Sequence, residues 1–261
     1  MLSHNQIKYV NSLKIKKFRQ KERAFIAEGE KCVEELLSSH FRIINIYALP
    51  EWITKYSKLI QSKQLEIQEI TSDELKKISD LVTPNQILAV AEIPFPDSEY
   101  IYTPGTISIM LDGIRDPGNM GTILRTADWF GIKKLICSTD SVDIFNPKVV
   151  QASMGSIGRV EASYLDLELF LKQISPEIPV YGALLHAPSI TEKKFTKAGI
   201  ILVGSESHGI SEKLIPFINE PVHIPRFSFS DSLNKTESLN ASIANGIICY
   251  EICKQLSLNY F

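Results

Sequence analysis

The sequence has 261 residues, of which 44% are hydrophobic and 22% are charged, so it can bury the core of one large or two ordinary globular domains. No apolar run approaches the ~18 residues of a membrane-spanning helix, and the N-terminus lacks the apolar core of a signal peptide. We therefore expect a soluble, cytoplasmic protein. The formal net charge of −2 excludes a protein that coats nucleic acid with its whole surface, but it does not exclude a local basic patch.

The cysteines are too few for a secreted disulfide scaffold, so we expect reduced thiols. They are Cys32, Cys137, Cys249 and Cys253. Cys249 and Cys253 have the spacing of two ligands on one helix, but no further ligand lies near them in the sequence. Packing is the favoured interpretation of this pair, and we predict no metal site.

Basic residues are concentrated near the N-terminus. The stretch from Lys8 to Arg23 contains one acid, Glu22, and seven basic residues. The basic residues are Lys8, Lys14, Lys16, Lys17, Arg19, Lys21 and Arg23. A charge run of this kind is commonly a solvated face. Clustered lysine and arginine with Phe18 among them also suit contacts with nucleic-acid phosphates. The candidates for such contacts are Lys16, Lys17, Arg19, Lys21 and Arg23.

Residues 1–95 alternate between strand-like and helix-like patterns. The strand-like segments are 42–49, 65–70 and 87–93, and the helix-like ones are 28–39, which follows Phe25-Ile26-Ala27, then 50–62 and a short segment after Thr71. This alternation predicts a small α/β domain. Pro94, Pro96 and Pro104 interrupt any periodic pattern, so we predict a linker at 96–105 and a second domain at 106–261.

The second domain begins with a strand, a tight turn and a helix between Thr106 and Ile132. An apolar run ends near Asp112, the turn Pro117-Gly118-Asn119 follows, and apolar residues then recur at helical spacing. Gly118 and Gly121 keep Cβ atoms away from the first, unpaired N–H groups of the helix, so a ligand can approach the backbone. Asn119 and Arg125 are the polar side chains left over. Seen alone, Asn119 reads as a helix cap and Arg125 as a solvated charge.

Strands and helices keep alternating to the C-terminus. Strand-like segments lie at 133–138, 178–185, 198–204 and 222–225, residues 143–158 read as a loop running into a helix start, and helices are predicted at 165–174 and from about 238 to 255. In the last helix, Leu239, Ile243 and Ile247 form an apolar stripe. Strands separated by helices predict a parallel sheet covered on both faces, and such sheets bind ligands at the carboxyl ends of their strands.

Three polar turns occur in a fixed order, each after an apolar strand. They are Asn119-Met-Gly121-Thr-Ile-Leu-Arg125, Gly204-Ser-Glu206-Ser-His-Gly209, and Ile224-Pro225 followed by Ser238-Leu239-Asn240. Together they resemble the three motifs of the SpoU (TrmH-like) family of RNA ribose 2′-O-methyltransferases, in the SPOUT superfamily. Asn146-Pro147-Lys148 with Ala152-Ser153-Met154-Gly155 is also similar to a segment common in this family. Residues 1–95 resemble the L30e-like substrate-binding domain that precedes the catalytic domain in many members.

The resemblance implies an α/β fold whose C-terminal segment is threaded into a trefoil knot, although knots are otherwise very rare. It implies S-adenosylmethionine as the cofactor, a homodimer formed through the catalytic domain, and RNA as the substrate, with ribosomal RNA favoured over transfer RNA. By position, the implied cofactor-binding residues are Gly204, Glu206, Gly209, Ile224, Pro225 and Leu239. The implied catalytic residues are Arg125, Asn119, Glu206, Ser238 and Asn240. The basic N-terminal residues would then contact RNA.

One segment departs from the family pattern. The segment that follows Pro225, residues 226–237, is longer than the corresponding segment of the family and contains no glycine. A second Ser-Leu-Asn lies within it, at 232–234. That copy has the usual distance from Pro225, whereas the copy at 238–240 leads into the apolar helix, and we choose the latter because the helix fixes its place. The altered loop motivates an alternative, a non-catalytic RNA-binding or ribosome-assembly protein on the same fold. A nucleotide-dependent oxidoreductase is disfavoured, since no GxGxxG follows the first strand of either domain.

The chemistry of methyl transfer assigns provisional roles to these residues. Transfer from a sulfonium to a ribose hydroxyl is an in-line displacement that needs no metal, so the enzyme aligns the reactants and stabilises a developing alkoxide. Arg125 offers fixed donors to that oxygen and to a phosphate, but its pKa above ~12 makes it a poor general base. Asn119, Ser238 and Asn240 are expected to hydrogen-bond the substrate and their neighbours. Glu206 is expected either to hold Arg125 or to balance the charge of the sulfonium.

Overall fold

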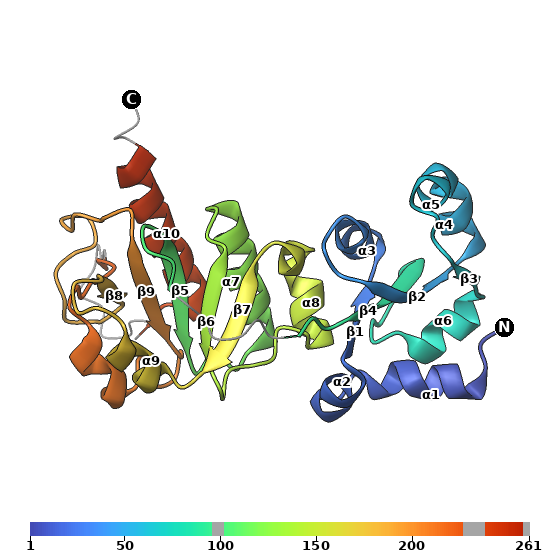
Figure 1. Ribbon diagram of the computed structural model, residues 1–261, viewed down its shortest axis with the longest axis horizontal. Coiled ribbons are helices and arrows are strands. Elements are labelled where there is room, and N and C mark those ends of the chain that lie inside the picture. The colour runs from blue at the N-terminus through green and yellow to red at the C-terminus, as the bar shows by residue number, and fades with distance from the viewer. Residues whose placement is uncertain (96–101, 227–237, 258–261) are drawn as a thin grey trace, which may run out of the picture. The chain divides into compact units, whose positions relative to one another are not determined.

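The computed structural model of the protein describes residues 1–95, 102–226 and 238–257 (Figure 1). The chain forms two compact units, one comprising Met1–Pro96 with Asp143–Arg159 and the other comprising Asp97–Val142 with Val160–Phe261. The expected domain boundaries differ from this division, because they assign residues 143–159 to the second domain. No helix in the described ranges is long and apolar enough to cross a membrane.

The first unit contains a four-stranded sheet of order β1-β4-β2-β3, in which β4 is antiparallel to both β1 and β2, and β3 is parallel to β2. Its strands are β1 (Ala24–Glu28), β2 (Ile43–Ala48), β3 (Gln68–Glu69) and β4 (Ile87–Glu92). Its helices are α1 (His4–Ser12), α2 (Lys16–Glu22), α3 (Glu30–Leu37), α4 (Pro50–Lys55), α5 (Ser57–Lys63), α6 (Ser72–Ile78), α8 (Pro147–Ser153) and the 3₁₀ helix η1 (Ser156–Gly158). The predicted alternation of strands and helices is present, and the basic N-terminal stretch forms α1 and α2.

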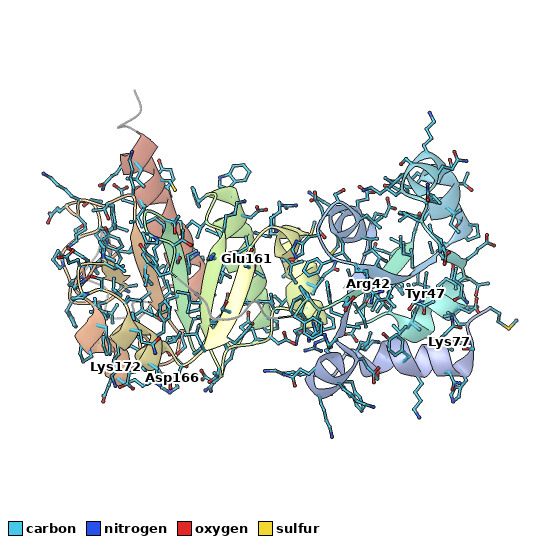
Figure 2. The ribbon with its side chains drawn as sticks, viewed as in Figure 1. Arg42, Tyr47, Lys77, Glu161, Asp166 and Lys172 are labelled. Atoms are coloured by element: carbon cyan, nitrogen blue, oxygen red, sulfur yellow. The ribbon has the colours of Figure 1, made fainter. Side chains whose placement is uncertain are left out.

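Both faces of the first sheet are covered, because alternate residues of β1 point to opposite sides. Ala24 and Ile26 join a core with α1, α6 and Tyr47 of β2, whose side chain is labelled in Figure 2. Phe25 points the other way, and its ring centroid lies 4.9 Å from that of Phe145. Cys32 Sγ donates a hydrogen bond of 3.8 Å to the carbonyl of Val150 on α8. Residues 143–159 therefore complete the core of the first unit, although they lie between two strands of the second.

The second unit contains a five-stranded sheet of order β7-β6-β5-β9-β8, in which every neighbouring pair is parallel. Its strands are β5 (Ile107–Asp112), β6 (Lys134–Ser138), β7 (Glu161–Leu165), β8 (Val180–Gly182) and β9 (Gly199–Gly204). Its helices are α7 (Pro117–Trp129), α9 (Leu167–Gln173), the 3₁₀ helix η2 (Glu212–Phe217) and α10 (Ala241–Ser257). The predicted α/β class with a parallel sheet is confirmed.

The parallel sheet is covered by helices on both faces. Met110 of β5 and Leu202 of β9 pack in a core with α9 and η2, while α7 and α10 contact each other on the opposite face (Figure 1). The α9 helix is capped by Asp166, which accepts from the N–H groups of Glu168 and Leu169 and is labelled in Figure 2. Residues 222–225, predicted as a strand, form only isolated bridges, from Val222 to Ala183 and from His223 to Ser189.

The last helix presents a different face from the one that its sequence suggests. Asn245, Ile248, Cys249 and Ile252 are buried, whereas Leu239 and Ile243 of the predicted stripe are 47% and 54% exposed. The stripe chosen from spacing alone therefore faces outward, and a second set of apolar residues packs on the protein. Residues 227–237 lie outside the described residues, and the trefoil knot stays a prediction.

Candidate active site

The site lies where three segments meet beyond the carboxyl ends of the parallel strands. The first segment joins β5 to α7, the second follows β9, and the third is the start of α10. β5 and β9 are neighbours with a register that pairs Asp112 with Gly204, so the loops that follow them start side by side. This edge is the one at which parallel α/β sheets bind ligands.

Asp116, and not Asn119, caps helix α7. The carboxylate of Asp116 accepts a hydrogen bond of 2.7 Å from the backbone N–H of Asn119, and Pro117 occupies the first helical turn, where a missing N–H costs nothing. A Cβ atom at Gly118 would lie 3.0 Å from Asp116 Oδ1, so glycine leaves room for the capping carboxylate. The interpretation of Asn119 as a cap is therefore wrong, and its side chain is available for other contacts.

The structure brings Asn119, Glu206 and Asn240 into one hydrogen-bonded cluster. Asn119 Nδ2 donates to Glu206 Oε1 at 2.7 Å, and Asn240 Nδ2 donates to Asn119 Oδ1 at 2.9 Å and also to Glu206 Oε1. The two residues farthest apart are 121 positions apart in the sequence. One residue from each of the three sequence motifs therefore meets at a single carboxylate oxygen.

The cluster is anchored to the N-terminus of α10. Asn240 Oδ1 accepts from Ser242 N at 3.0 Å and from Ile243 N at 3.2 Å, so Asn240 caps the helix. Glu206 Oε1 also accepts from the N–H of Ala241 at 3.2 Å. A carboxylate at this end of a helix is stabilised by the helix dipole, which holds the negative charge of Glu206 in place.

Glycine is required in the turn that carries Glu206. Ser205 and Gly209 exchange two backbone hydrogen bonds of 3.0 and 2.8 Å, which folds the turn back over the end of β9. A Cβ at Gly204 would lie 2.1 Å from the carbonyl of Gly209, and Gly209 itself has a φ of +66°. Gly204 and Gly209 thus shape the second turn through their lack of a side chain.

A cavity of about 380 Å³ opens beside the cluster. It lies between the loop after β5, the residues after β6 and the turn after β9. The residues that line it are Asp112, Gly113, Ile114, Arg115, Asp116, Asn119, Asp140, Ser205, Glu206, Ser207, His208, Gly209, Ser211 and Ala241. Two of the predicted catalytic residues, Asn119 and Glu206, thus face one cavity that is large enough for a small organic ligand.

The loop after β5 is held by the residues after β6. Ser138 Oγ accepts from Gly113 N at 2.9 Å and donates to Asp140 Oδ1 at 2.7 Å. Because its single proton goes to Asp140, the 2.9 Å contact with Ser141 has Ser141 as donor. Arg115 Nη2 donates to Asp140 Oδ2 at 2.8 Å, and this bond, with that from Ser138, lowers the pKa of Asp140 below its ordinary value. Asp140 is therefore a carboxylate at neutral pH.

Other predicted site residues lie outside this cavity. Arg125 is exposed on α7, six residues beyond Asn119 and so about 9 Å further along the helix axis. Ser238 and Leu239 are exposed just before α10, and Ile224 and Pro225 are half-buried after the bridges at 222–223. Gly204 ends β9. The described lining of the cavity includes none of these six residues. The Ser-Leu-Asn copy at 232–234 lies outside the described residues.

The five basic candidates of the N-terminal stretch have different environments. Arg19 is 1% exposed, and its guanidinium donates to Asp143 Oδ2 at 2.7 and 3.0 Å and to the carbonyls of Leu13 and Lys14. Arg19 is therefore a buried structural residue, and the prediction that it contacts RNA is wrong, because its donors are already used inside the protein.

Arg23 is also engaged within the protein. It donates to the carbonyl of Ile93 at 2.7 Å, and its guanidinium carbon lies 3.3 Å from the ring centroid of Phe95. Lys16, Lys17 and Lys21 are exposed, so three of the five candidates have ammonium groups open to solvent.

Sequence reasoning missed several of the residues that line the cavity beside Asn119 and Glu206. Arg115 and Asp116 lie in the same segment as Asn119, and Asp112 is the last residue of the preceding strand. The signal available for them was their position directly after a buried strand, where ligands bind in parallel sheets. Asp140 had the same signal after β6, but only the structure pairs it with Arg115.

Family models match most of the chain. The model of the SpoU rRNA methylase family matches residues 106–250, and that of the MRM3-like substrate binding domain matches residues 4–89. The first matched range lies within the expected residues 106–261, and the second lies within the expected residues 1–95. The resemblance predicted from the three turns is thus confirmed.

Individual relatives match over nearly their whole length. The chain is 27% identical over 251 residues to the 23S rRNA (guanosine(2553)-2′-O)-methyltransferase RlmP of Bacillus subtilis, covering 95% of this chain and 96% of the relative. Among solved structures, a protein of the TrmH family from Porphyromonas gingivalis is 37% identical with a TM-score of 0.81, covering 97% of this chain and 98% of that one. An rRNA methyltransferase from Sinorhizobium meliloti with bound AdoMet is 25% identical with a TM-score of 0.82, covering 98% and 97%.

Proposed function

The chain belongs to the SpoU rRNA methylase family, and from this premise we propose that it transfers a methyl group from S-adenosylmethionine to a ribose 2′-hydroxyl of structured RNA, most plausibly ribosomal RNA. The observation that carries the proposal is the cluster of Asn119, Glu206 and Asn240, in which one residue from each motif meets at one carboxylate. Such convergence of residues from distant parts of the sequence is expected of a catalytic site and is not needed to stabilise a helix cap.

Within this proposal, Glu206 provides negative charge for the sulfonium of the cofactor. Its described partners are the amides of Asn119 and Asn240 and the N–H of Ala241, so of the two roles considered for it, holding Arg125 is not supported. A carboxylate fixed by three donors before the reaction needs no reorganisation as charge changes during transfer. Asn119 and Asn240 in turn position one another and the substrate.

Arg125 and Ser238 complete the proposed catalytic set from outside the cavity. Arg125 is exposed on α7, so its donors are open to a ribose oxygen or an RNA phosphate. It would orient the nucleophile and stabilise the developing alkoxide, and the RNA phosphate would accept the proton. Ser238 lies two residues before the cap Asn240, and its hydroxyl would hydrogen-bond the substrate.

The proposed cofactor, S-adenosylmethionine, fits the chemistry of the residues present. Gly204, Ile224 and Leu239 would hold it through backbone groups, with Pro225 and Gly209 shaping the adjoining turns. Leu239 is an apolar side chain that is 47% exposed next to the carboxylate cluster, which suits a ligand with one apolar and one cationic part. The cofactor supplies the activated methyl group, and the protein aligns the hydroxyl with it.

RNA would be recognised partly by the first unit. Lys16, Lys17 and Lys21 on and beside α2 are exposed and suit sequence-independent phosphate contacts. The names of RlmP and of a relative from Streptomyces viridochromogenes give 23S rRNA as their substrate, which supports this substrate class. Structured RNA offers unpaired nucleotides in loops, where a single ribose is accessible.

We also propose a homodimer formed through the second unit. Ile243 and Tyr250 of α10 are 54% and 58% exposed, Trp129 of the adjoining α7 is 84% exposed, and a Cβ at Gly246 would meet nothing within 4 Å. An apolar surface of this kind suits contact with a second copy. Light scattering should give a dimer for the wild type, and Gly246→Trp should weaken it and reduce cofactor binding. A stable wild-type monomer at micromolar concentration that still binds cofactor would contradict the proposal.

Mapping of 2′-O-methyl groups tests the proposed activity. Ribosomal and transfer RNA from cells with and without the gene should differ at a ribose, and complementation should restore the methyl group. The alternative, a non-catalytic RNA-binding or ribosome-assembly protein, rests on the altered segment at 226–237. Titration calorimetry with S-adenosylmethionine separates the two, because a protein that binds RNA but no cofactor would support the alternative and exclude the enzyme.

A further inference from the structure

The cavity beside the catalytic cluster is rich in hydrogen-bond acceptors of fixed orientation. Four carboxylates line it, from Asp112, Asp116, Asp140 and Glu206, together with the guanidinium of Arg115 and the imidazole ring of His208. Asp112, Asp116 and Glu206 already accept backbone or amide hydrogens within the protein. Asp140 and Arg115 form an ion pair in the same lining, with side chains that are 52% and 74% exposed.

The excess of negative charge decides which part of an RNA this cavity can take. A phosphate would be repelled by the carboxylates, whereas a neutral nucleobase with N–H donors would be attracted. Proteins read unpaired RNA bases by hydrogen bonds to the Watson–Crick and Hoogsteen edges and by stacking on His rings or Arg guanidinium planes. Arg115 and His208 both line the cavity and provide such groups.

We propose that this cavity binds the base of the nucleotide to be methylated and that the base is guanine, with Asp140 and Arg115 as the specificity-determining pair. This proposal rests on the proposed function, because it places the target ribose at the neighbouring cluster of Asn119, Glu206 and Asn240. The Asp140 carboxylate accepts from N1–H and the N2 amino group of guanine. Arg115 donates to O6 and N7, the contact most often used to read guanine.

The other three bases match this pair less well. Adenine has no carbonyl oxygen for Arg115 and only an exocyclic amine for a carboxylate. Uracil offers a single N–H donor on its Watson–Crick edge, and cytosine offers one amine. Guanine combines two neighbouring N–H donors with an adjacent carbonyl, which matches a carboxylate and a guanidinium held 2.8 Å apart.

The geometry of the pair is set before a ligand arrives. Asp140 Oδ1 accepts from Ser138 Oγ, which also accepts from Gly113 N, and Ser141 Oγ accepts from Ile114 N at 3.2 Å. The loop that carries Arg115 is thereby fixed to the loop that carries Asp140. Pre-organised groups of this kind support discrimination between similar ligands.

The test compares Asp140→Asn with Asp166→Asn, a matched change at the cap of α9, where asparagine caps as well as aspartate. RNA fragments carrying the mapped site are made with guanosine or with inosine, which lacks only the N2 amine. Wild type and Asp166→Asn should methylate guanosine about 5- to 150-fold faster than inosine, the range for one good base contact. Asp140→Asn should reduce this ratio to about one, with its affinity for S-adenosylmethionine unchanged.

Saturation-transfer NMR can compare the binding of guanosine 5′-monophosphate with that of inosine 5′-monophosphate. This measurement of base preference does not depend on methyl transfer. Wild type should prefer the guanosine nucleotide, and Asp140→Asn should lose the preference. If no RNA is methylated while this preference persists, the proposed function fails and the guanine site stands. A mapped site at a uridine, an unchanged ratio in Asp140→Asn, or a parallel loss of cofactor affinity in that variant would overturn the guanine site.

Discussion

The three polar turns and the basic N-terminal stretch both have a sequence pattern that predicts function. In the structure, however, the side chains of the two regions have different environments. In the cluster beside the cavity, Asn119, Glu206 and Asn240 come from three distant segments, and each is hydrogen-bonded to the other two. In the basic stretch near the N-terminus, neighbouring residues differ in exposure, because Arg19 is 1% exposed whereas Lys17 is exposed.

The difference shows that residue type predicts chemistry only where the fold leaves the side chain free to act. Arginine and lysine are equivalent in a count of charge, yet the planar guanidinium of Arg19 satisfies four acceptor contacts inside the first unit. In the cluster, the cap Asp116 satisfies the backbone and so leaves Asn119 free. The following experiments test this contrast, in order of decreasing expected effect.

Arg19→Met should destabilise the protein by about 3–5 kcal/mol, because it leaves Asp143 buried without its partner. Lys17→Met, the same change on the exposed side of α2, should stay within about 0.5 kcal/mol of wild type. Urea denaturation of both variants measures the difference. Equal stability of the two variants would show that Arg19 is no more structural than its neighbour.

Arg125→Ala should lower the rate of methyl transfer by about 10²- to 10³-fold, the typical effect of removing one donor to a developing oxyanion. Because Arg125 is exposed on α7 and outside the described cavity, the fold and cofactor affinity should be unchanged. Single-turnover kinetics with calorimetry as the control separates these effects. A rate within a few-fold of wild type, with normal cofactor binding, would remove Arg125 from the catalytic set.

Asp116→Ala should cost about 1 kcal/mol of stability through loss of the cap on α7, and it should also lower methyl transfer because Asn119 lies in the same turn. Asn146→Ala removes the cap of α8 in the first unit and should cost a similar amount of stability. Only Asp116→Ala should lower activity per folded molecule. If both variants were equally active, the first turn of α7 would not position the site.

Reversal of Lys16, Lys17 and Lys21 to glutamate should weaken RNA binding without changing affinity for S-adenosylmethionine. Each phosphate contact that is lost should lower the slope of log K against log salt by roughly 0.7 to 0.9. Filter binding over a salt series measures the slope, with the stability of the variant as the control. A slope equal to that of wild type would make these lysines a solvated face.

The sequence predicted the architecture well where apolar runs were continuous. β5 and β9 are buried over nearly their whole length, and both were expected as strands. β7 was not expected, because this edge strand is half exposed and has no continuous apolar run. Residues 143–159 were assigned to the second domain, since position along the chain does not reveal that Phe145 packs on Phe25.

The candidate site was predictable in its motif residues and not in their arrangement. The resemblance to the SpoU motifs implied Asn119, Glu206 and Asn240 as site residues, but it did not show that Asp116 caps α7 or that the three side chains bond to one another. In α10, periodicity selected the apolar stripe of Leu239, Ile243 and Ile247, whereas the helix buries Ile248 and Ile252. When a helix is apolar over much of its circumference, periodicity does not determine which face is buried. Packing against neighbouring elements decides it.

Transfer of a labelled methyl group from S-adenosylmethionine to ribosomal RNA tests the central claim most directly. The RNA is taken from cells lacking the gene, and Glu206→Gln is assayed beside wild type, because its amide cannot serve as the charged acceptor shared by Asn119 and Asn240. The account predicts label in a 2′-O-methylated nucleotide with wild type and a large loss of it with the variant. Label on a base, or equal labelling by the two proteins, would contradict it.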